Sequence, residues 1–284
     1  EEIDFSVHDE LLKEEKYQAF TKENVNTPFA FQEGPFARIH LIKFTDNEYR
    51  LLITMHHVIA DGWSSVLFIN EFTACYNELL HHKQPIAPIK VEFPEYVNWL
   101  QQNKSSQQWK QDEQYLLDTF SGKSFNIQLP FDRNTTVNVH ESNSIQLTMP
   151  ADKVRRLKNW SSANNLTLFM TFLSAFELVL FKLSQQRQIV VGIPVTGRSM
   201  PNTEKSMGYF SHIVPLLATY DPDQNINSYL KALTSRLFDA FDHQEYPYAD
   251  FRELMKEDEK TTFGEGVNVN FNFEFRIRCL HTVK

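Results

Sequence analysis

The sequence has few cysteines and no excess of positive charge, and each of these absences argues against a class of protein. The 284 residues include two cysteines, Cys75 and Cys279, which are far apart and lack metal-type spacing. This argues against a disulfide framework and favours a reducing cytoplasmic location. The net charge of −8 argues against bulk nucleic-acid binding. The acidic start, EEIDFSVHDE, lacks the pattern of a signal peptide.

Long hydrophobic runs are also few. The longest, LTLFMTFLSAFELVLF at 166–181, contains Glu177 and is short for a bilayer span. We therefore expect a buried core helix there, and no membrane protein. Apolar residues nevertheless make up 42% of the chain, including 24 phenylalanines, which is enough for a sizeable core.

Segments typical of strands and helices alternate through both halves. Apolar runs at 37–44 and 48–55 predict a β-hairpin, and the spacing after Gly62 predicts a helix with Ser64 or Ser65 as its N-cap. The polar stretch 129–142 predicts a division into an N-terminal lobe, 1–132, and a C-terminal lobe, 133–284. The expected fold is α/β (α+β), with two lobes of similar kind. Further helices are expected at 93–120, 151–163, 166–184 and 226–242, and strands at 144–150, 188–194, 212–220 and 267–275.

The sequence MHHVIADGWSS, residues 55–65, places titratable groups between the expected strand and the expected helix. The histidines and the Asp-Gly turn can be structural. His57 and Asp61 also have the spacing of metal ligands, although no third ligand is near in sequence. In a catalytic interpretation, His57 accepts a proton from an attacking amine or hydroxyl, and Asp61 orients it directly or braces the loop through an arginine. Gly62 then offers its N–H to a developing oxyanion.

MHHVIADGWSS resembles the HHxxxDGxS core motif of condensation domains of nonribosomal peptide synthetases. Other segments resemble motifs of this family in the expected order. The family's two upstream motifs and its last motif have no counterpart, so the resemblance implies a fragment with an incomplete N-lobe and a truncated C-lobe. The matching segments are NTPFAFQEGPFARIHL (26–41), FPEYVNWLQ (93–101), VGIPVTGRS (191–199), MGYFSHIVPL (207–216) and HQEYPYADF (243–251).

The resemblance implies two chloramphenicol-acetyltransferase-like lobes in a V shape, with a tunnel between them. Donor and acceptor peptidyl carrier proteins deliver substrates on phosphopantetheine arms, next to an adenylation domain, and no bound cofactor or metal is expected. The acceptor's amino group attacks the donor thioester, with His57 as the base or as the group that positions the amine. Gly62 lines the reaction centre. Structural roles at the active site fall to His56, Asp61, Arg198 and Ser64. A salt bridge between Asp61 and Arg198 of the second lobe is expected to hold the loop and the lobes together.

A second set of residues is assigned to the substrate tunnel by the resemblance. Structural alternatives stay open for these residues, since the two aromatics of the MGYF sequence can belong to the core and His243 can be structural. His212 stands where the family usually has asparagine. The assigned residues are Trp63, Tyr209, Phe210, His212 and His243.

Three functions are compatible with these residues. The first is peptide-bond formation between carrier-bound acyl groups. The second is a related acyltransferase that acts on a free amine or alcohol. The third is a catalytically silent module that docks carriers.

Overall fold

The computed structural model describes residues 1–81, 91–130, 143–255 and 266–274. Two compact units can be distinguished. The first comprises Glu1–Trp99 and Arg198–Phe210, and the second comprises Leu100–Gly197 and Ser211–Leu280. A segment from late in the sequence is therefore part of the first unit. The predicted lobe boundary between residues 132 and 133 lies outside the described residues and stays a prediction.

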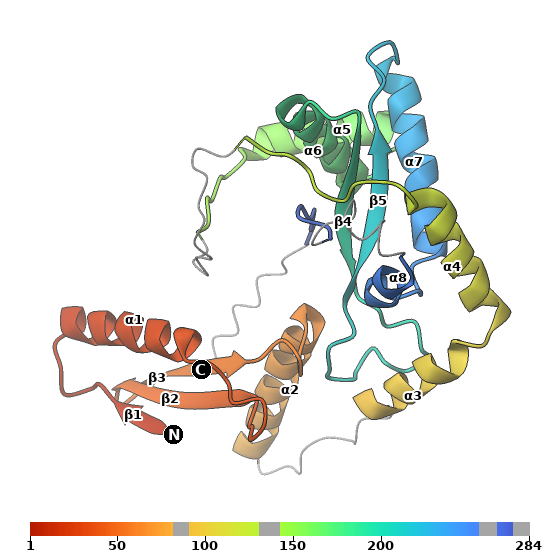
Figure 1. The fold of residues 1–284 in the computed structure, drawn as a ribbon. Coiled ribbons are helices and arrows are strands. Elements are labelled where there is room, and N and C mark those ends of the chain that lie inside the picture. Colours follow the sequence, from red (N-terminus) through yellow and green to blue (C-terminus); the bar gives the residue numbers. More distant parts are fainter. Residues whose placement is uncertain (82–90, 131–142, 256–265, 275–284) are drawn as a thin grey trace. The chain divides into compact units, whose positions relative to one another are not determined.

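The first unit contains a three-stranded sheet in the order β1-β2-β3 (Figure 1). β1 (Glu2–Asp4) runs parallel to β2 (Ala37–Thr45), which pairs antiparallel with β3 (Glu48–Met55). The predicted hairpin is thus confirmed. Two helices complete the unit's regular structure up to residue 80: α1 (Glu10–Asn26) lies between β1 and β2 in sequence, and α2 (Gly62–Leu80) follows β3.

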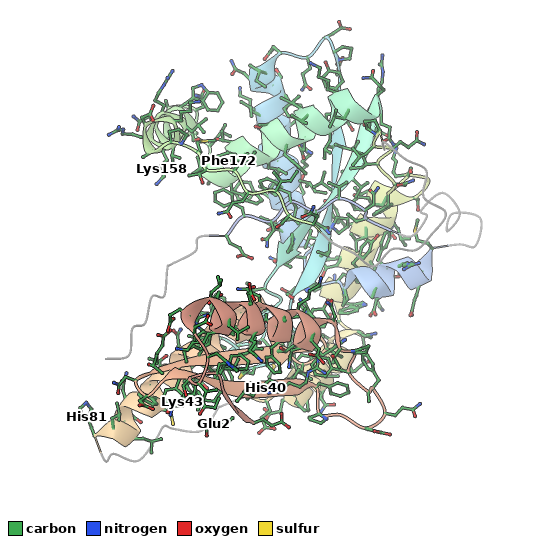
Figure 2. The ribbon with its side chains drawn as sticks, turned by 90° about the vertical axis from the view of Figure 1, so that its left-hand side faces the viewer. Glu2, His40, Lys43, His81, Lys158 and Phe172 are labelled. Atoms are coloured by element: carbon green, nitrogen blue, oxygen red, sulfur yellow. The ribbon has the colours of Figure 1, made fainter. Side chains whose placement is uncertain are left out.

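β2 buries alternate side chains, as a strand with one covered face does. His40, Ile42 and Phe44 are buried. The Nε2 atom of His40, labelled in Figure 2, lies 2.7 Å from the amide nitrogen of Asn24 on α1. Tyr17 of α1 packs edge-on against Phe44, with ring centroids 5.6 Å apart. Contacts from α1 thus cover the buried face of the hairpin.

α2 begins at Gly62 because Asp61 caps it. The Oδ1 atom of Asp61 accepts a hydrogen bond from the backbone N–H of Ser64 at 2.8 Å. The predicted cap, Ser64 or Ser65, was wrong. Aspartate and serine are equally good N-caps, so the local sequence did not discriminate between them. The hydroxyl of Ser64 instead bonds to a distant segment, as described below.

The second unit contains an antiparallel pair of strands, β4 (Gln188–Val195) and β5 (His212–Thr219), which confirms two predicted strands. The predicted helix 93–120 is two helices, because residues 104–106 interrupt it and Ser106 caps the second one. The other helices predicted for this half are present. The helices are α3 (Phe93–Asn103), which begins in the first unit, α4 (Gln107–Phe120), α5 (Ala151–Ala163), α6 (Leu168–Ser184), α7 (Ile226–Asp242) and α8 (Tyr248–Leu254).

Two predicted strands differ from the structure. Residues 144–150 form no strand, and Ile145 and Leu147 are each 90% exposed, because no strand within the described residues pairs with this segment. Residues 267–274 keep their alternating exposure but make one isolated parallel bridge, between Gly192 of β4 and Asn270. A Cβ atom at residue 192 would lie 2.0 Å from the Oδ1 atom of Asn270, so glycine permits this approach.

α6 is the core helix expected from the apolar run at 166–181. Leu173 is fully buried, and so is Glu177, which accepts hydrogen bonds from Tyr229 Oη at 2.6 Å and from Arg236. A buried carboxylate needs such partners. In the part of the chain that the structure describes, no single helix is long and apolar enough to cross a membrane. α5 and α6 meet the length and composition criteria together, as a pair bent by 99°.

Candidate active site

The residues of the HHxxxDG sequence lie where β3 ends and α2 begins. β3 ends at Met55, and the N–H of His56 donates to the carbonyl of Phe36 at 2.9 Å. His57 follows and is exposed, whereas Asp61 is only 2% exposed. The loop therefore presents one imidazole to solvent and is anchored at its other end by a buried carboxylate.

The anchor is an ion pair between Asp61 and Arg198. The Nη1 atom of Arg198 lies 2.7 Å from Asp61 Oδ2, and its Nη2 atom lies 3.1 Å from Oδ1. Both side chains are almost fully buried, at 4% exposure for Arg198 and 1% for Asp61. This forked geometry is the strong form of a carboxylate–guanidinium pair. The salt bridge expected between these residues is therefore present. It does not join two units, because the segment Arg198–Phe210 belongs to the same unit as Asp61.

Asp61 makes stability depend on pH. Burial acts to raise its pKa, but hydrogen bonds from Arg198 and Ser64 outweigh burial and hold the pKa below its usual value of 3.8. The carboxylate of Asp61 therefore binds a proton less readily in the folded protein than in the unfolded chain. Ionised Asp61 contributes fully to stability at pH values above its pKa in the unfolded chain. This contribution is lost as the pH falls through its lower pKa in the folded protein.

We expect the difference in unfolding free energy between the natural protein and Asp61→Asn to shrink when the pH is lowered from about 5 to about 3. Urea denaturation at both pH values measures this difference. The control is Asp46→Asn, which removes a carboxylate that is 91% exposed in the same unit. A difference that stays constant or grows at the lower pH would contradict the assignment.

Ser64 ties the start of α2 to the segment that carries the MGYF sequence. Its hydroxyl donates to the carbonyl of Gly208 at 2.8 Å and accepts from the N–H of Gly208 at 3.0 Å. It also accepts from Arg198 Nη2 at 3.2 Å. The residue is fully buried, which fits a hydroxyl with three partners. Sequence reasoning missed the pairing with Gly208, because 144 residues separate the two.

Phe210 fills the space beneath this network. Its ring is buried, and the guanidinium carbon of Arg198 lies 4.3 Å above it. The rings of Phe93 and Tyr96 on α3 pack against it at centroid distances of 5.1 and 4.6 Å. A Cβ atom on Gly208 would lie 2.4 Å from the ring of Phe93, so a side chain at 208 would displace the segment. These contacts make Phe210 a core residue of the first unit.

His57 does not bond to Asp61. The acceptors of Asp61 are occupied by Arg198, by the N–H of Ser64 and by the N–H of Phe210. Of the two ways in which Asp61 was expected to support His57, the geometry matches bracing through an arginine. The ring of His57 instead meets the ring of Tyr209, with centroids 4.8 Å apart and planes at 77°.

His56 points into a group of phenylalanines. Its Nδ1 atom accepts a hydrogen bond from the N–H of Val58 at 3.1 Å. Three aromatic rings surround it, from Phe29, Phe31 and Phe36, at centroid distances of 5.8, 4.7 and 6.3 Å. These contacts are those of a histidine that fixes a loop, and the catalytic assignment to the second histidine stays a prediction.

A cavity of about 380 Å³ opens beside the two histidines. Apolar side chains form much of its wall, and the polar ones come from the end of α1 and the residue after it, from β3 and from the two histidines. Sequence reasoning did not identify this cavity, although the NTPFAF stretch at 26–31 supplies five of its ten lining residues. The lining residues besides the histidines are Val25, Asn26, Thr27, Pro28, Phe29, Phe31, Thr54 and Met55.

Gly62 and Trp63 occupy the first turn of α2. Apart from its chain neighbours and the backbone of its own helix, no atom lies within 4 Å of the position that a Cβ atom on Gly62 would take, so there is open space on that side of the residue. Backbone N–H groups at a helix start favour negative charge. Trp63 is 46% exposed, and its indole N–H donates to the carbonyl of Glu204 at 2.9 Å. Their roles in catalysis and in substrate contact stay predictions.

His212 and His243 belong to the second unit. The Nε2 atom of His212 lies 2.7 Å from the carbonyl oxygen of Gln244. The Nδ1 atom of His243 lies 2.8 Å from Asp112 Oδ1, and its ring stacks on Tyr115 with centroids 4.2 Å apart. Both histidines thus have structural partners, and their assignment to a substrate tunnel stays a prediction. Within the described residues, no three His, Cys, Asp or Glu side chains come together as a metal site would require.

Comparison with known proteins finds one matching family model and relatives among large synthases. A family model described as the condensation domain matches residues 1–278. The chain is 26% identical over 259 residues to bacitracin synthase 1 of Bacillus licheniformis, covering 89% of this chain and 5% of that protein. It is 30% identical over 238 residues to surfactin synthase subunit 1 of Bacillus subtilis (strain 168), covering 84% of this chain and 6% of the relative.

Solved structures show the same fold. The first condensation domain of the CDA synthetase superposes with a TM-score of 0.75 at 21% identity, over 98% of this chain and 60% of that one. The X-domain from teicoplanin biosynthesis superposes with a TM-score of 0.79 at 18% identity, over 90% of this chain and 57% of that one. The chain thus spans about three fifths of these structures and a small fraction of the two synthases.

Proposed function

The chain belongs to the condensation-domain family, and on this premise we propose that it forms peptide bonds in nonribosomal peptide synthesis. The donor is an aminoacyl or peptidyl thioester on one carrier protein, and the acceptor is the amino group of an aminoacyl thioester on another. The match to the condensation-domain family supports this substrate class, and two of the relatives are named as synthases, of bacitracin and of surfactin.

One observation carries the proposal. His57 stands exposed at the end of β3, on a loop whose other end is held by the buried Asp61–Arg198 pair. A group that exchanges protons with a substrate must be reachable and must also be held in place. The cavity beside His57 gives an acyl or aminoacyl group a place to lie.

The proposed reaction needs one proton transfer. The acceptor nitrogen attacks the thioester carbonyl carbon, so the C–N bond forms and the carbonyl oxygen takes up negative charge. The N–H of Gly62, at the start of α2, stabilises that charge. The C–S bond then breaks, and the proton lost by the nitrogen reaches the leaving thiolate. His57 either carries this proton or holds the attacking amine in position.

The remaining parts of the proposal follow from the family. We propose two carrier proteins as partners, each with a phosphopantetheine arm that brings its substrate, and an adenylation domain in the same synthetase. The V-shaped arrangement, the tunnel and the cytoplasmic location remain predictions.

A single-turnover transfer assay tests the function. The full-length protein is mixed with a loaded donor carrier and a loaded acceptor carrier, and intact-protein mass spectrometry follows the acceptor. The proposal expects the acceptor carrier to gain the mass of the donor acyl group. Acylation of free amines or alcohols alone would assign a related acyltransferase activity. No acylation of any acceptor, with carriers still bound, would assign a docking module.

A further inference from the structure

We propose that Tyr209 is a positioning residue for His57, which holds the imidazole in place by ring contact instead of by a hydrogen bond. The inference rests on the proposed function of His57. Within the described residues, the imidazole makes no hydrogen bond and no ion pair, and its aromatic contact is with Tyr209, at 4.8 Å and 77°. The carboxylate that would orient a catalytic histidine in a Ser-His-Asp arrangement is occupied elsewhere.

Both side chains lie at the surface, so a buried core does not force the contact. Tyr209 is 46% exposed, and His57 is exposed. An exposed imidazole without a partner samples several rotamers, and ordering it costs conformational entropy. Catalytic groups need positions fixed to about 0.5 Å. A fixed ring edge-to-face with the imidazole restricts the rotamers that it can adopt.

The backbone on both sides of Tyr209 is held by the start of α2. On one side, the N–H and the carbonyl of Gly208 both bond to the hydroxyl of Ser64, at 3.0 and 2.8 Å. On the other side, the N–H of Phe210 donates to Asp61 Oδ2 at 3.2 Å. Tyr209 is therefore fixed to the same helix start to which the His57 loop leads. The side chains of the DGxS sequence thus have a second use, which is to place a ring opposite the imidazole.

Phe210 and Gly208 make this placement rigid. The ring of Phe210 is 2% exposed and packs against Phe93, which also occupies the space where a Cβ atom on Gly208 would lie. The residues on either side of Tyr209 thus leave the segment little freedom to shift. A ring carried on such a segment can position a neighbour, whereas a ring on a freely moving loop cannot.

The test compares Tyr209→Leu, which removes the ring, with Tyr209→Phe, which keeps it. In the full-length protein we expect Tyr209→Leu to lower the single-turnover transfer rate about tenfold, with the KM for the acceptor carrier unchanged, because placement of the base affects the chemical step. Tyr209→Phe is expected to restore most of the rate. Tyr49→Leu is the matched control, since Tyr49 is also 46% exposed in the same unit.

A spectroscopic measurement separates this inference from the proposed function. The ring protons of His57, assigned by their loss in His57→Ala, should carry a ring-current shift in the natural protein and in Tyr209→Phe, and should lose it in Tyr209→Leu. An unchanged His57 signal in Tyr209→Leu would overturn the inference. So would a normal transfer rate in Tyr209→Leu, or an equal loss of rate in both variants. If no transfer is seen with the natural protein, the proposed function fails, and the ring-current shift still decides whether Tyr209 holds His57.

Discussion

Replacement of Arg198 by alanine is expected to lower the free energy of unfolding of the first unit by about 3–5 kcal/mol, because it leaves a buried carboxylate without its counter-ion. Asp61 would keep its hydrogen bonds from the N–H groups of Ser64 and Phe210, but its charge would be unpaired at 2% exposure. Urea denaturation measures the loss.

Arg50 provides the matched control. It pairs with Glu14 at 2.8 Å in the same unit, and the two side chains are 34% and 47% exposed. Solvent screens such a pair, so Arg50→Ala should cost much less stability than Arg198→Ala, although the guanidinium of Arg50 also packs on the ring of Phe44. The contrast between the two arginines tests burial as the cause, because both variants remove a guanidinium that contacts a carboxylate at a similar distance.

A double variant sharpens the argument. Asp61→Asn with Arg198→Met removes both charges and keeps an oxygen for the helix cap, so it should lose less stability than Arg198→Ala alone. If the double variant is as unstable as the sum of its single variants, the two residues do not interact energetically. In that case the loop that carries His57 would be anchored by the Ser64–Gly208 contacts, and the ion pair would be incidental to its stability.

The hairpin and most helices could be predicted from the sequence because their signals are local. The alternation of His40, Ile42 and Phe44 is visible within one short run of residues, and it reports the same burial that the structure shows. The N-cap of α2 was harder to predict, because Asp61 and Ser64 are both good N-caps. In the structure the hydroxyl of Ser64 bonds to Gly208, which is distant in sequence, and Asp61 caps the helix. Residues 144–150 have strand-like composition, but a strand also requires a paired neighbour.

The candidate site was predictable to the extent that it follows a motif. The Asp61–Arg198 pair was expected from family resemblance, since 137 residues separate its members and no periodicity relates them. The bonds from Ser64 to Gly208 and the contact of His57 with Tyr209 depend on where the segment Arg198–Phe210 packs in three dimensions. Such long-range contacts have no local signature. Gly208 of the MGYF sequence could be recognised from the sequence. The reason for a glycine there, which is that the ring of Phe93 occupies the position of a Cβ atom, could not.

Replacement of His57 by alanine is expected to slow transfer between carriers by about 10²–10⁴-fold, the usual contribution of a positioned general acid or base. The fold should remain, because the side chain is exposed and has no hydrogen-bonding partner within the described residues. Single-turnover mass spectrometry measures the rate, and the urea midpoint checks the fold. His81→Ala is the matched control, since His81 is an exposed histidine at the C-terminal end of α2 in the same unit.

Rescue by free imidazole distinguishes the two roles left open for His57. If the residue carries the proton, imidazole in solution should restore part of the rate of His57→Ala by taking over that transfer at the vacated position. If His57 instead orients the amine, free imidazole should not restore the rate, because a diffusing base supplies a proton acceptor but no fixed geometry. An unchanged rate in His57→Ala would remove the residue from the mechanism. The catalytic assignment would then move to the N–H of Gly62 at the start of α2, with stabilisation of the oxyanion as the main contribution to the rate.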